Sequence, residues 1–269
     1  MLLKGTTAIV TGAATGLGRG TAEVFAREGA NVVLVGRRLG KLEEVVGPIR
    51  DKGGSALAVS GDVSDYDSVR NVIARTKSEF GGIDVLVNNA VRHPKWNYTH
   101  RVGVEHFDES YAVNIRGPFM FMKEAIPSML ERGGGSIINV SSILGVRGSK
   151  YASAYCATKA GMVNLTRAVA LEYLEHGIRV NVVCVGGIDP EHTDDRHYTP
   201  EERLFMSAAR GPALPVEGPY LAEGEEPPPR PRTGVSAWDM AETLLYLAGP
   251  NSRHITGAVI NADRGASAG

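Results

Sequence analysis

The chain has 269 residues, of which 43% are hydrophobic and 22% charged, the composition of an ordinary globular protein with enough residues for a sizeable core. Its 29 lysines and arginines nearly balance 30 aspartates and glutamates, so it carries no basic footprint for nucleic acid or an anionic membrane. The apolar runs are far shorter than the roughly 20 residues of a membrane span, and the N-terminus lacks the apolar stretch of a signal peptide. The two cysteines, Cys156 and Cys184, make neither a disulfide framework nor a C-x-x-C metal pair. We therefore expect a cytoplasmic protein that binds neither nucleic acid nor membranes.

Short runs rich in β-branched residues alternate with longer stretches of helical period. Strands are predicted over 7–11, 31–36, 55–60, 85–88, 136–141, 179–184 and 258–261. Helices are predicted over 17–28, 39–51, 65–80, 105–131, 153–175 and 237–248, with Asp62 and Ser64 placed to cap the third. Several strands are apolar at consecutive positions, which is typical of parallel strands covered on both faces. The pattern predicts an α/β fold, a Rossmann-like doubly wound parallel sheet of about seven strands.

One compositional break interrupts this alternation. Residues 189–235 are rich in Pro, Glu and Arg and contain the run Pro227-Pro228-Pro229. So long an irregular segment in a compact fold is usually a lid or a disordered region. We expect a single domain over 1–269 with 189–235 as a substrate lid loop, mobile when empty, whose flank 201–209 forms a short helix over the cleft.

A glycine-rich turn joins the first predicted strand to the first predicted helix. It has the spacing G-x-x-x-G-x-G over Gly12 to Gly18, rather than the standard G-x-G-x-x-G. Glycines let the backbone approach a pyrophosphate, and the helix N-terminus supplies free N–H groups and a positive dipole end. A plain strand–helix turn is the alternative, but the position favours a dinucleotide site with contacts from Gly12, Thr15, Gly16, Leu17 and Gly18.

The second predicted strand ends in two arginines, Arg37 and Arg38. A carboxylate at this place would accept a hydrogen bond from the ribose 2′-OH of NAD, whereas a guanidinium suits a 2′-phosphate. The sequence thus favours NADP, bound by Arg37, and leaves NAD open. Both arginines could instead be solvated at the start of a helix.

Tyr155 and Lys159 are spaced i,i+4, so they share one face of the predicted helix 153–175. A phenol with its ordinary pKa of ~10 is a poor base at neutral pH, and a neighbouring ammonium stabilises its phenolate. Such a tyrosine can exchange a proton with an alcohol or carbonyl oxygen. Ser142 ends the fifth predicted strand, at the sheet edge where ligands bind in this fold, and could hydrogen-bond that oxygen.

With these residues the chain resembles the short-chain dehydrogenase/reductase family, in its single-domain branch, over nearly its whole length. The matching motifs are the glycine turn, Asp62-Val63, Asn88-Asn89-Ala90, Asn114 in Asn-Ile-Arg-Gly, Ser142, and Tyr155-x-x-x-Lys159. The resemblance implies an NAD(P)-dependent enzyme acting on CH–OH or C=O groups, and a homo-oligomer, either a dimer or a tetramer. Hydride transfer belongs to the nicotinamide, and the protein supplies orientation and proton exchange.

The resemblance also implies a role for each matching residue. Tyr155 would be the general acid/base, Ser142 would polarise the substrate oxygen, and Lys159 would lower the pKa of Tyr155 and bind the nicotinamide ribose. Asn114 would hold a water that links Lys159 to solvent. The remaining cofactor contacts would come from Asp62 and Val63 at the adenine, Asn89 and Ala90 along its ribose, and Ile188 at the carboxamide.

Three positions depart from the family pattern. Val91 follows Asn-Asn-Ala in place of Gly, and Val185 precedes a glycine in place of Pro. Pro190 replaces a Thr that often meets the carboxamide, a role that Thr193 could take only in a rearranged loop. These departures put the nicotinamide end of the pocket in question and leave the proton-transfer groups intact.

The favoured function is an NADP-dependent oxidoreductase that interconverts a secondary alcohol and a ketone. The alternatives are an NAD-dependent alcohol dehydrogenase, a 3-oxoacyl thioester reductase, and a non-enzymatic nucleotide-binding scaffold. No metal is expected, because the acidic, His-containing stretch 189–197 has no fixed ligand spacing. His93, His100 and His106 are read as surface residues near the substrate cleft, and the apolar series from Phe107 to Ile126 as core or a subunit interface.

Overall fold

The structure is a computed structural model that describes residues 1–188, 198–209, 214–215 and 235–268. Its strands all pair in parallel in one sheet, ordered β3-β2-β1-β4-β5-β6-β7. They are β1 (Thr7–Thr11), β2 (Asn31–Gly36), β3 (Ser55–Ser60), β4 (Val85–Asn88), β5 (Gly135–Ser142), β6 (Ile178–Val185) and β7 (Val259–Ala262). This arrangement confirms the predicted doubly wound sheet, and all seven strands are within one residue of the predicted bounds at both ends.

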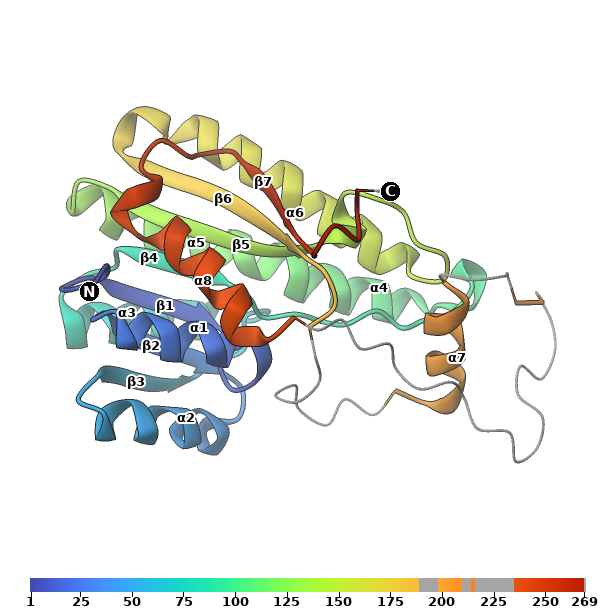
Figure 1. The fold of residues 1–269 in the computed structure, drawn as a ribbon, viewed down its shortest axis with the longest axis horizontal. Helices are drawn as coiled ribbons and strands as arrows, with labels where there is room; N and C mark the ends of the chain where they lie inside the picture. The colour runs from blue at the N-terminus through green and yellow to red at the C-terminus, as the bar shows by residue number, and fades with distance from the viewer. Residues whose placement is uncertain (189–197, 210–213, 216–234, 269) are drawn as a thin grey trace.

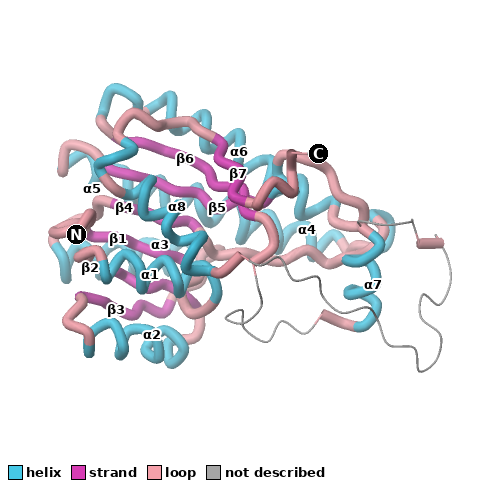
Figure 2. Tube along the Cα trace, in the orientation of Figure 1, coloured by secondary structure: helices cyan, strands magenta, loops and turns pink. Residues whose placement is uncertain are grey.

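Helices cover both faces of the sheet (Figures 1 and 2). They are α1 (Gly16–Arg27), α2 (Leu39–Asp51), α3 (Tyr66–Phe80), α4 (Val104–Tyr111), α5 (Gly117–Glu131), α6 (Ser153–Glu172), α7 (Pro200–Ala208) and α8 (Ala237–Ala248). The apolar faces of α1, α2 and α8 form one core against the sheet, and those of α3 and α5, with part of α6, form the other. Short single turns lie at η1 (Thr99–Arg101), η3 (Ile143–Gly145), η4 (Leu174–His176) and η6 (Pro250–Ser252).

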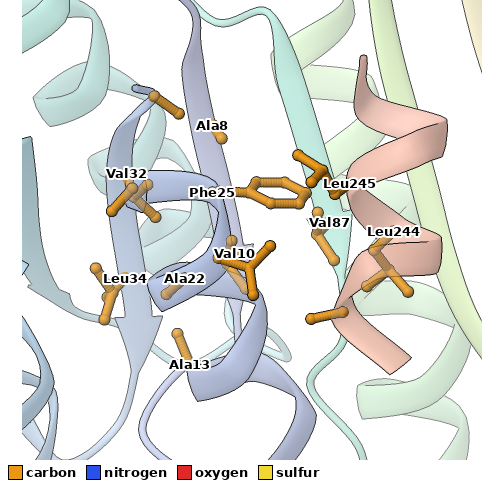
Figure 3. Packing of buried hydrophobic residues seen from close by; sticks show 14 of the residues in the cluster. Ala8, Val10, Ala13, Ala22, Phe25, Val32, Leu34, Val87, Leu244 and Leu245 are labelled. Atoms are coloured by element: carbon orange, nitrogen blue, oxygen red, sulfur yellow. The ribbon is translucent and has the colours of Figure 1, made fainter. Parts of the chain in front are cut away.

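The first of these cores fixes the position of the helix that follows the glycine turn. Figure 3 shows Phe25 of α1 between the sheet residue Val10 and Leu245 of α8, and all three side chains are buried. Gly20 allows α1 and α8 to approach closely, since a Cβ there would lie 3.0 Å from the carbonyl oxygen of Ala237. The N-terminus of α1 is therefore held rigidly above the carboxyl end of β1.

The predicted helix 105–131 is interrupted. Between α4 and α5 the chain makes a wider π-helical turn, η2 (Ala112–Arg116). Pro118 explains the break, because it has no amide hydrogen to donate to the carbonyl of Asn114 four residues earlier. π-Turns inside helices occur frequently at functional sites, and this one contains Asn114.

The cap predicted for the third helix is also different. The N-cap of α3 is Asp65, whose side chain accepts a hydrogen bond from the Ser68 N–H. Asp62 instead accepts from the backbone N–H and hydroxyl of Ser64, at 2.8 and 2.6 Å. Asp62 thus does not cap α3. It stabilises the loop that leads into this helix.

Within the predicted lid segment 189–235, the structure describes residues 198–209, 214–215 and 235. The flank predicted to be helical is the helix α7, which lies beyond the sheet edge in Figure 1. The acidic stretch 189–197, which includes Pro190 and Thr193, and the proline run at 227–229 lie outside the described residues. None of the described helices combines the length and apolar composition that crossing a bilayer requires.

Candidate active site

A cleft of ≈ 1610 Å³ opens at the carboxyl edge of the sheet. It lies around the place where β1 and β4 are neighbours and the strand order reverses, the usual ligand site of a doubly wound sheet. It brings together most of the predicted site residues, from the loops after β1, β2, β3, β4 and β6, the first turn of α1, the end of β5 and the helix α6. Those that line it are Gly12, Thr15, Gly16, Leu17, Arg37, Asp62, Val63, Asn89, Ala90, Ser142, Tyr155, Lys159 and Ile188.

The glycine turn forms one end of the cleft. Gly12 and Gly16 have φ values of 65° and 54°, which side-chain-bearing residues rarely adopt. A Cβ on Gly18 would lie 2.2 Å from the carbonyl oxygen of Gly12, so only glycine permits this closure. Gly18 therefore packs beneath the turn and does not line the cleft, whereas the first turn of α1 faces it with unpaired N–H groups.

Asn89 braces this turn from the adjacent strand. Its side-chain amide donates to the carbonyls of Thr11 and Gly12, at 2.9 and 3.2 Å. The hydroxyl of Thr11 in turn accepts from the backbone N–H groups of Asn89 and Ala90. The Asn-Asn-Ala motif is thus tied to the glycine motif, which explains why the two occur together.

The far end of the cleft carries Arg37 and Asp62. Arg37 follows β2, is exposed and lies close enough to Asp62 to act on its ionisation. Burial tends to raise the pKa of Asp62, but the two hydrogen bonds from Ser64 and the charge of Arg37 lower the pKa overall. This end of the cleft thus holds one carboxylate beside an arginine.

Ser142, Tyr155 and Lys159 all line the cleft, where the end of β5 is hydrogen-bonded to α6. Ser142 is the last residue of β5, and its Oγ accepts a hydrogen bond from the Leu144 N–H at 3.1 Å. That bond uses a lone pair and leaves the hydroxyl hydrogen available to another acceptor. Lys159 Nζ lies 5.7 Å from the ring centre of Tyr155, one helical turn away on α6.

Lys159 is almost completely buried, with 2% of its surface exposed. Its Nζ donates to the carbonyl of Val140 at 2.9 Å. Burial disfavours the ammonium form and lowers the pKa of Lys159 to about 8, against a smaller opposite effect of the Cys184 thiol. A lysine held in this way can change its protonation state near neutral pH.

Asn114 lies behind the cleft lining, buried in the π-turn. Its side chain accepts from the Arg92 N–H at 2.8 Å and donates to the Arg92 carbonyl at 3.0 Å. It also donates to the Thr158 hydroxyl, which donates to the carbonyl of Tyr155. Asn114 thus joins the segment after β4 to the helix that carries Tyr155 and Lys159.

The other wall of the cleft comes from segments whose individual residues the sequence did not single out. Trp96 lines it from the segment after β4, and Tyr198, Met206 and Ala209 line it from α7 and its flanks. These residues belong to no sequence motif, so only their position in the fold shows that they line the cleft. Of the three histidines noted above, His93 and His106 line the cleft.

Two of the three departures from the family pattern lie within the described residues. Val91 and Val185 both line the cleft, so the nicotinamide end has aliphatic side chains where glycine and proline are usual. Gly186 packs against Asp263, with only 3.0 Å between a would-be Cβ and that residue's Cβ. The third departure, at Pro190, falls outside the described residues.

Comparison with known proteins agrees with this geometry. Residues 6–201 match the family model described as short chain dehydrogenase. An uncharacterized oxidoreductase, YxbG, of Bacillus subtilis (strain 168) is 39% identical over 263 residues, covering 98% of this chain and 91% of its own. The chain belongs to the short-chain dehydrogenase/reductase family.

Two solved structures are similar along their whole length. Levodione reductase superposes with a TM-score of 0.82 at 28% identity, covering 99% of both chains. A 3-ketoacyl-ACP reductase from Sinorhizobium meliloti 1021 superposes with a TM-score of 0.81 at 34% identity, covering 97% of this chain and 99% of its own. The protein is thus an NAD(P)-dependent oxidoreductase that acts on CH–OH or C=O groups.

Proposed function

We propose that this short-chain dehydrogenase/reductase uses NADP to interconvert a secondary alcohol and a ketone, with Tyr155 as the general acid/base. The observation that carries the proposal is that Ser142, Tyr155 and Lys159 all line one cleft that also contains the glycine turn. A binding scaffold would need the glycine turn alone. The matched set of proton-handling groups therefore favours an enzyme over a scaffold.

The residues divide the proton chemistry among them. In the reducing direction Tyr155 donates its hydroxyl proton to the substrate oxygen as negative charge develops there, and in the oxidising direction its phenolate removes that proton. Ser142 donates a hydrogen bond to the same oxygen, since its own lone pair is occupied by the Leu144 N–H. The ammonium of Lys159 stabilises the phenolate, and Asn114 is proposed to hold the water that returns a proton to Lys159.

The cleft fits a dinucleotide. The glycine turn has the positive φ values and the close backbone approach that a pyrophosphate site needs. When bound, the nicotinamide supplies the hydride. The pyrophosphate would rest against Gly12, Thr15, Gly16 and Leu17, the adenosine against Asp62, Val63, Asn89 and Ala90, and the carboxamide near Ile188.

Arg37 supports NADP over NAD. It lines the cleft after β2, where the ribose 2′-position falls in folds of this type. Its guanidinium would form charge-assisted hydrogen bonds with a 2′-phosphate. Asp62, the carboxylate at this end, is already engaged by Ser64 and so offers less to a 2′-OH.

Reduction of a 3-oxoacyl thioester is the second candidate for the same chemistry. The similarity to a solved 3-ketoacyl-ACP reductase at 34% identity is the observation in its favour. The proton transfer would be the same for both substrates. The two candidates differ only in what the substrate wall, formed by the segment 91–98 and α7, accommodates.

We also propose that residues 1–269 form a single domain, with 189–235 as a lid that closes over the substrate. The proposal of a lid is supported by α7, which lines the cleft from within this segment. A homo-oligomeric, cytoplasmic enzyme remains our expectation for the whole protein.

The test is Tyr155→Phe, which removes only the proton-exchanging hydroxyl. We expect it to bind NADPH with nearly unchanged affinity, measured by the change in nicotinamide fluorescence. We expect turnover of ketones, measured by absorbance at 340 nm, to fall by about 10³-fold or more. Ser142→Ala is expected to lose less, about 10²–10³-fold, because it removes one polarising donor. More than a tenth of wild-type turnover in Tyr155→Phe would falsify the acid/base role.

A further inference from the structure

We infer that the substrate carries a carboxylate, or a group of the same charge, which binds to Lys95 and Arg147 at the mouth of the cleft. The inference deepens the proposed function and rests on it, because it concerns the compound whose oxygen Tyr155 would protonate. It is drawn from the charges and hydrogen-bonding groups of the substrate wall.

Lys95 and Arg147 come from two segments that lie against each other. The Asn97 N–H donates to the carbonyl of Tyr151 at 3.0 Å, and the rings of Tyr98 and Tyr151 meet edge to face with centres 5.1 Å apart. Both segments line the cleft that Ser142 and Tyr155 also line. The two cations therefore border the same cleft as the proposed reacting groups.

Two carboxylates that line the cleft or lie on α7, among the described residues, already have partners. Glu109 is already paired with Arg92 at 2.6 Å, and Glu202 accepts from the Thr199 N–H in the capping box of α7. Within the described part of the chain, neither Lys95 nor Arg147 has a carboxylate within 4.0 Å.

Asp263 is an acid on which Arg147 acts. Arg147 lies within electrostatic reach of it and contributes to its lowered pKa, after the hydrogen bonds from Ser267 and Gly265. The Asp263 carboxylate accepts a hydrogen bond from the Gly265 N–H of its own turn, at 2.9 Å. An anion entering the cleft would thus find both cations available.

Two polar groups of the wall, on Trp96 and His106, favour an acceptor on the ligand. Trp96 Nε1 is buried and has no acceptor among the described residues. His106 Nε2, the acceptor atom of the neutral ring, is already used by the Lys95 N–H at 3.0 Å. Burial, followed by the charge of Arg92, lowers the pKa of His106. An Nε2 that accepts a hydrogen bond belongs to a neutral ring.

A carboxylate matches this wall because it offers only acceptors and a negative charge. A neutral polyol would bring donors for which the wall has few unused acceptors. An entirely apolar substrate would leave the buried Trp96 N–H without a partner, which is unfavourable. The chemistry of the wall therefore favours a hydroxy acid or oxo acid.

The test measures binding directly, through the fluorescence of Trp96. Trp238 is the other tryptophan, lies on α8 and donates to Glu23, so Trp238→Phe leaves Trp96 as the single reporter. In this background, with NADP present, 4-oxopentanoate and its methyl ester are titrated at low and high salt. The two compounds share their ketone and differ in charge.

We expect the acid to bind on the order of fivefold more tightly than the ester, with a preference that weakens at high salt. Lys95→Gln and Arg147→Gln should each reduce this preference toward one. Lys52→Gln, which removes an exposed lysine outside the cleft, should leave it unchanged. Equal or weaker binding of the acid, or no saturable quenching by the acid below about 10 mM, overturns the inference.

Different measurements test the inferred anion site and the proposed role of Tyr155, so either can be wrong while the other stands. Tyr155→Phe changes no charge, so it should retain the preference for the acid while losing turnover. If Tyr155→Phe stays active and the preference persists, the acid/base assignment is wrong and the anion site stands. If turnover is lost and wild type shows no preference, the assignment stands and the anion site is wrong.

Discussion

At the scale of single residues, Lys159 shows how burial changes acid–base behaviour. In the unfolded chain its amine has the ordinary pKa of 10.5, and in the folded protein burial lowers the pKa to about 8. Between these values the unfolded state binds more protons than the folded state, so the free energy of unfolding rises with pH. Below pH 8 the buried ammonium costs stability, and the cost disappears as the amine loses its proton.

The prediction compares wild type with Lys159→Met, which replaces the amine by an apolar side chain of similar length. The unfolding free energy of wild type minus that of the variant should increase from pH 7 to pH 10, by at most about 1.4 kcal/mol per pH unit. Urea denaturation at a series of pH values measures this difference. Lys52→Met, at an exposed position, is the control. A difference that stays constant with pH would show that Lys159 remains charged.

Arg37 carries the choice of cofactor at the same scale. Arg37→Asp replaces a partner of the 2′-phosphate by a repulsive charge and offers the 2′-OH an acceptor. We expect the ratio of kcat/KM for NADPH to that for NADH to fall about tenfold or more. The same substitution at Arg38 shows which of the two arginines matters. An unchanged ratio in Arg37→Asp would remove the main support for NADP.

At the scale of elements, α7 is held to the rest of the molecule by a small aromatic cluster. Phe205 is fully buried, with its ring 4.9 Å from that of Tyr151 and 6.1 Å from that of Tyr98. Both tyrosine hydroxyls also bond to the backbone of Leu214, Tyr98 to its carbonyl and Tyr151 to its N–H. This cluster is separate from the cores on the sheet.

Phe205→Ala should undock α7, because truncating a buried phenylalanine typically costs about 3–5 kcal/mol. We expect faster tryptic cleavage after Arg203 and a higher KM for the carbonyl substrate, with NADPH affinity nearly unchanged. Glu201→Ala, at an exposed position on the same helix, is the control. In wild type, NADP together with a substrate should slow the same cleavage if the segment is a lid. Cleavage at the wild-type rate in Phe205→Ala would mean that the cluster does not hold the helix.

At the scale of the whole molecule, the apolar series on α4 and α5 divides between core and surface. Met122 and Ile126 are buried, whereas Phe107, Tyr111 and Phe119 are each more than 40% exposed. Exposed aromatic residues gathered on neighbouring helices are typical of a protein interface. They support the expectation of a homo-oligomer.

Phe119→Glu should therefore reduce the mass measured by light scattering, since it places a charge in an apolar contact. Leu39→Glu, an exposed apolar residue at the start of α2, should leave that mass unchanged. A wild-type chain with the mass of a monomer would refute the predicted oligomer.

The sequence by itself determined the sheet and the glycine turn, and it supplied the proposed catalytic set. Consecutive apolar β-branched residues predict buried parallel strands, and a four-residue spacing places Tyr155 and Lys159 on one helical face wherever that helix lies. These are local regularities of the backbone, so the sequence alone is sufficient to read them.

The tertiary structure decided what depends on neighbours distant in sequence. It lowered the pKa of Lys159 by burial, placed Trp96 and Met206 on the cleft wall, and moved Asp62 from a helix cap to the loop beside Arg37. The hydrogen bonds of the Asn114 side chain belong to the same group, because they run to Arg92 and Thr158 on other segments. Burial, charge balance and side-chain contacts arise only when separate segments pack together, and no local pattern records them.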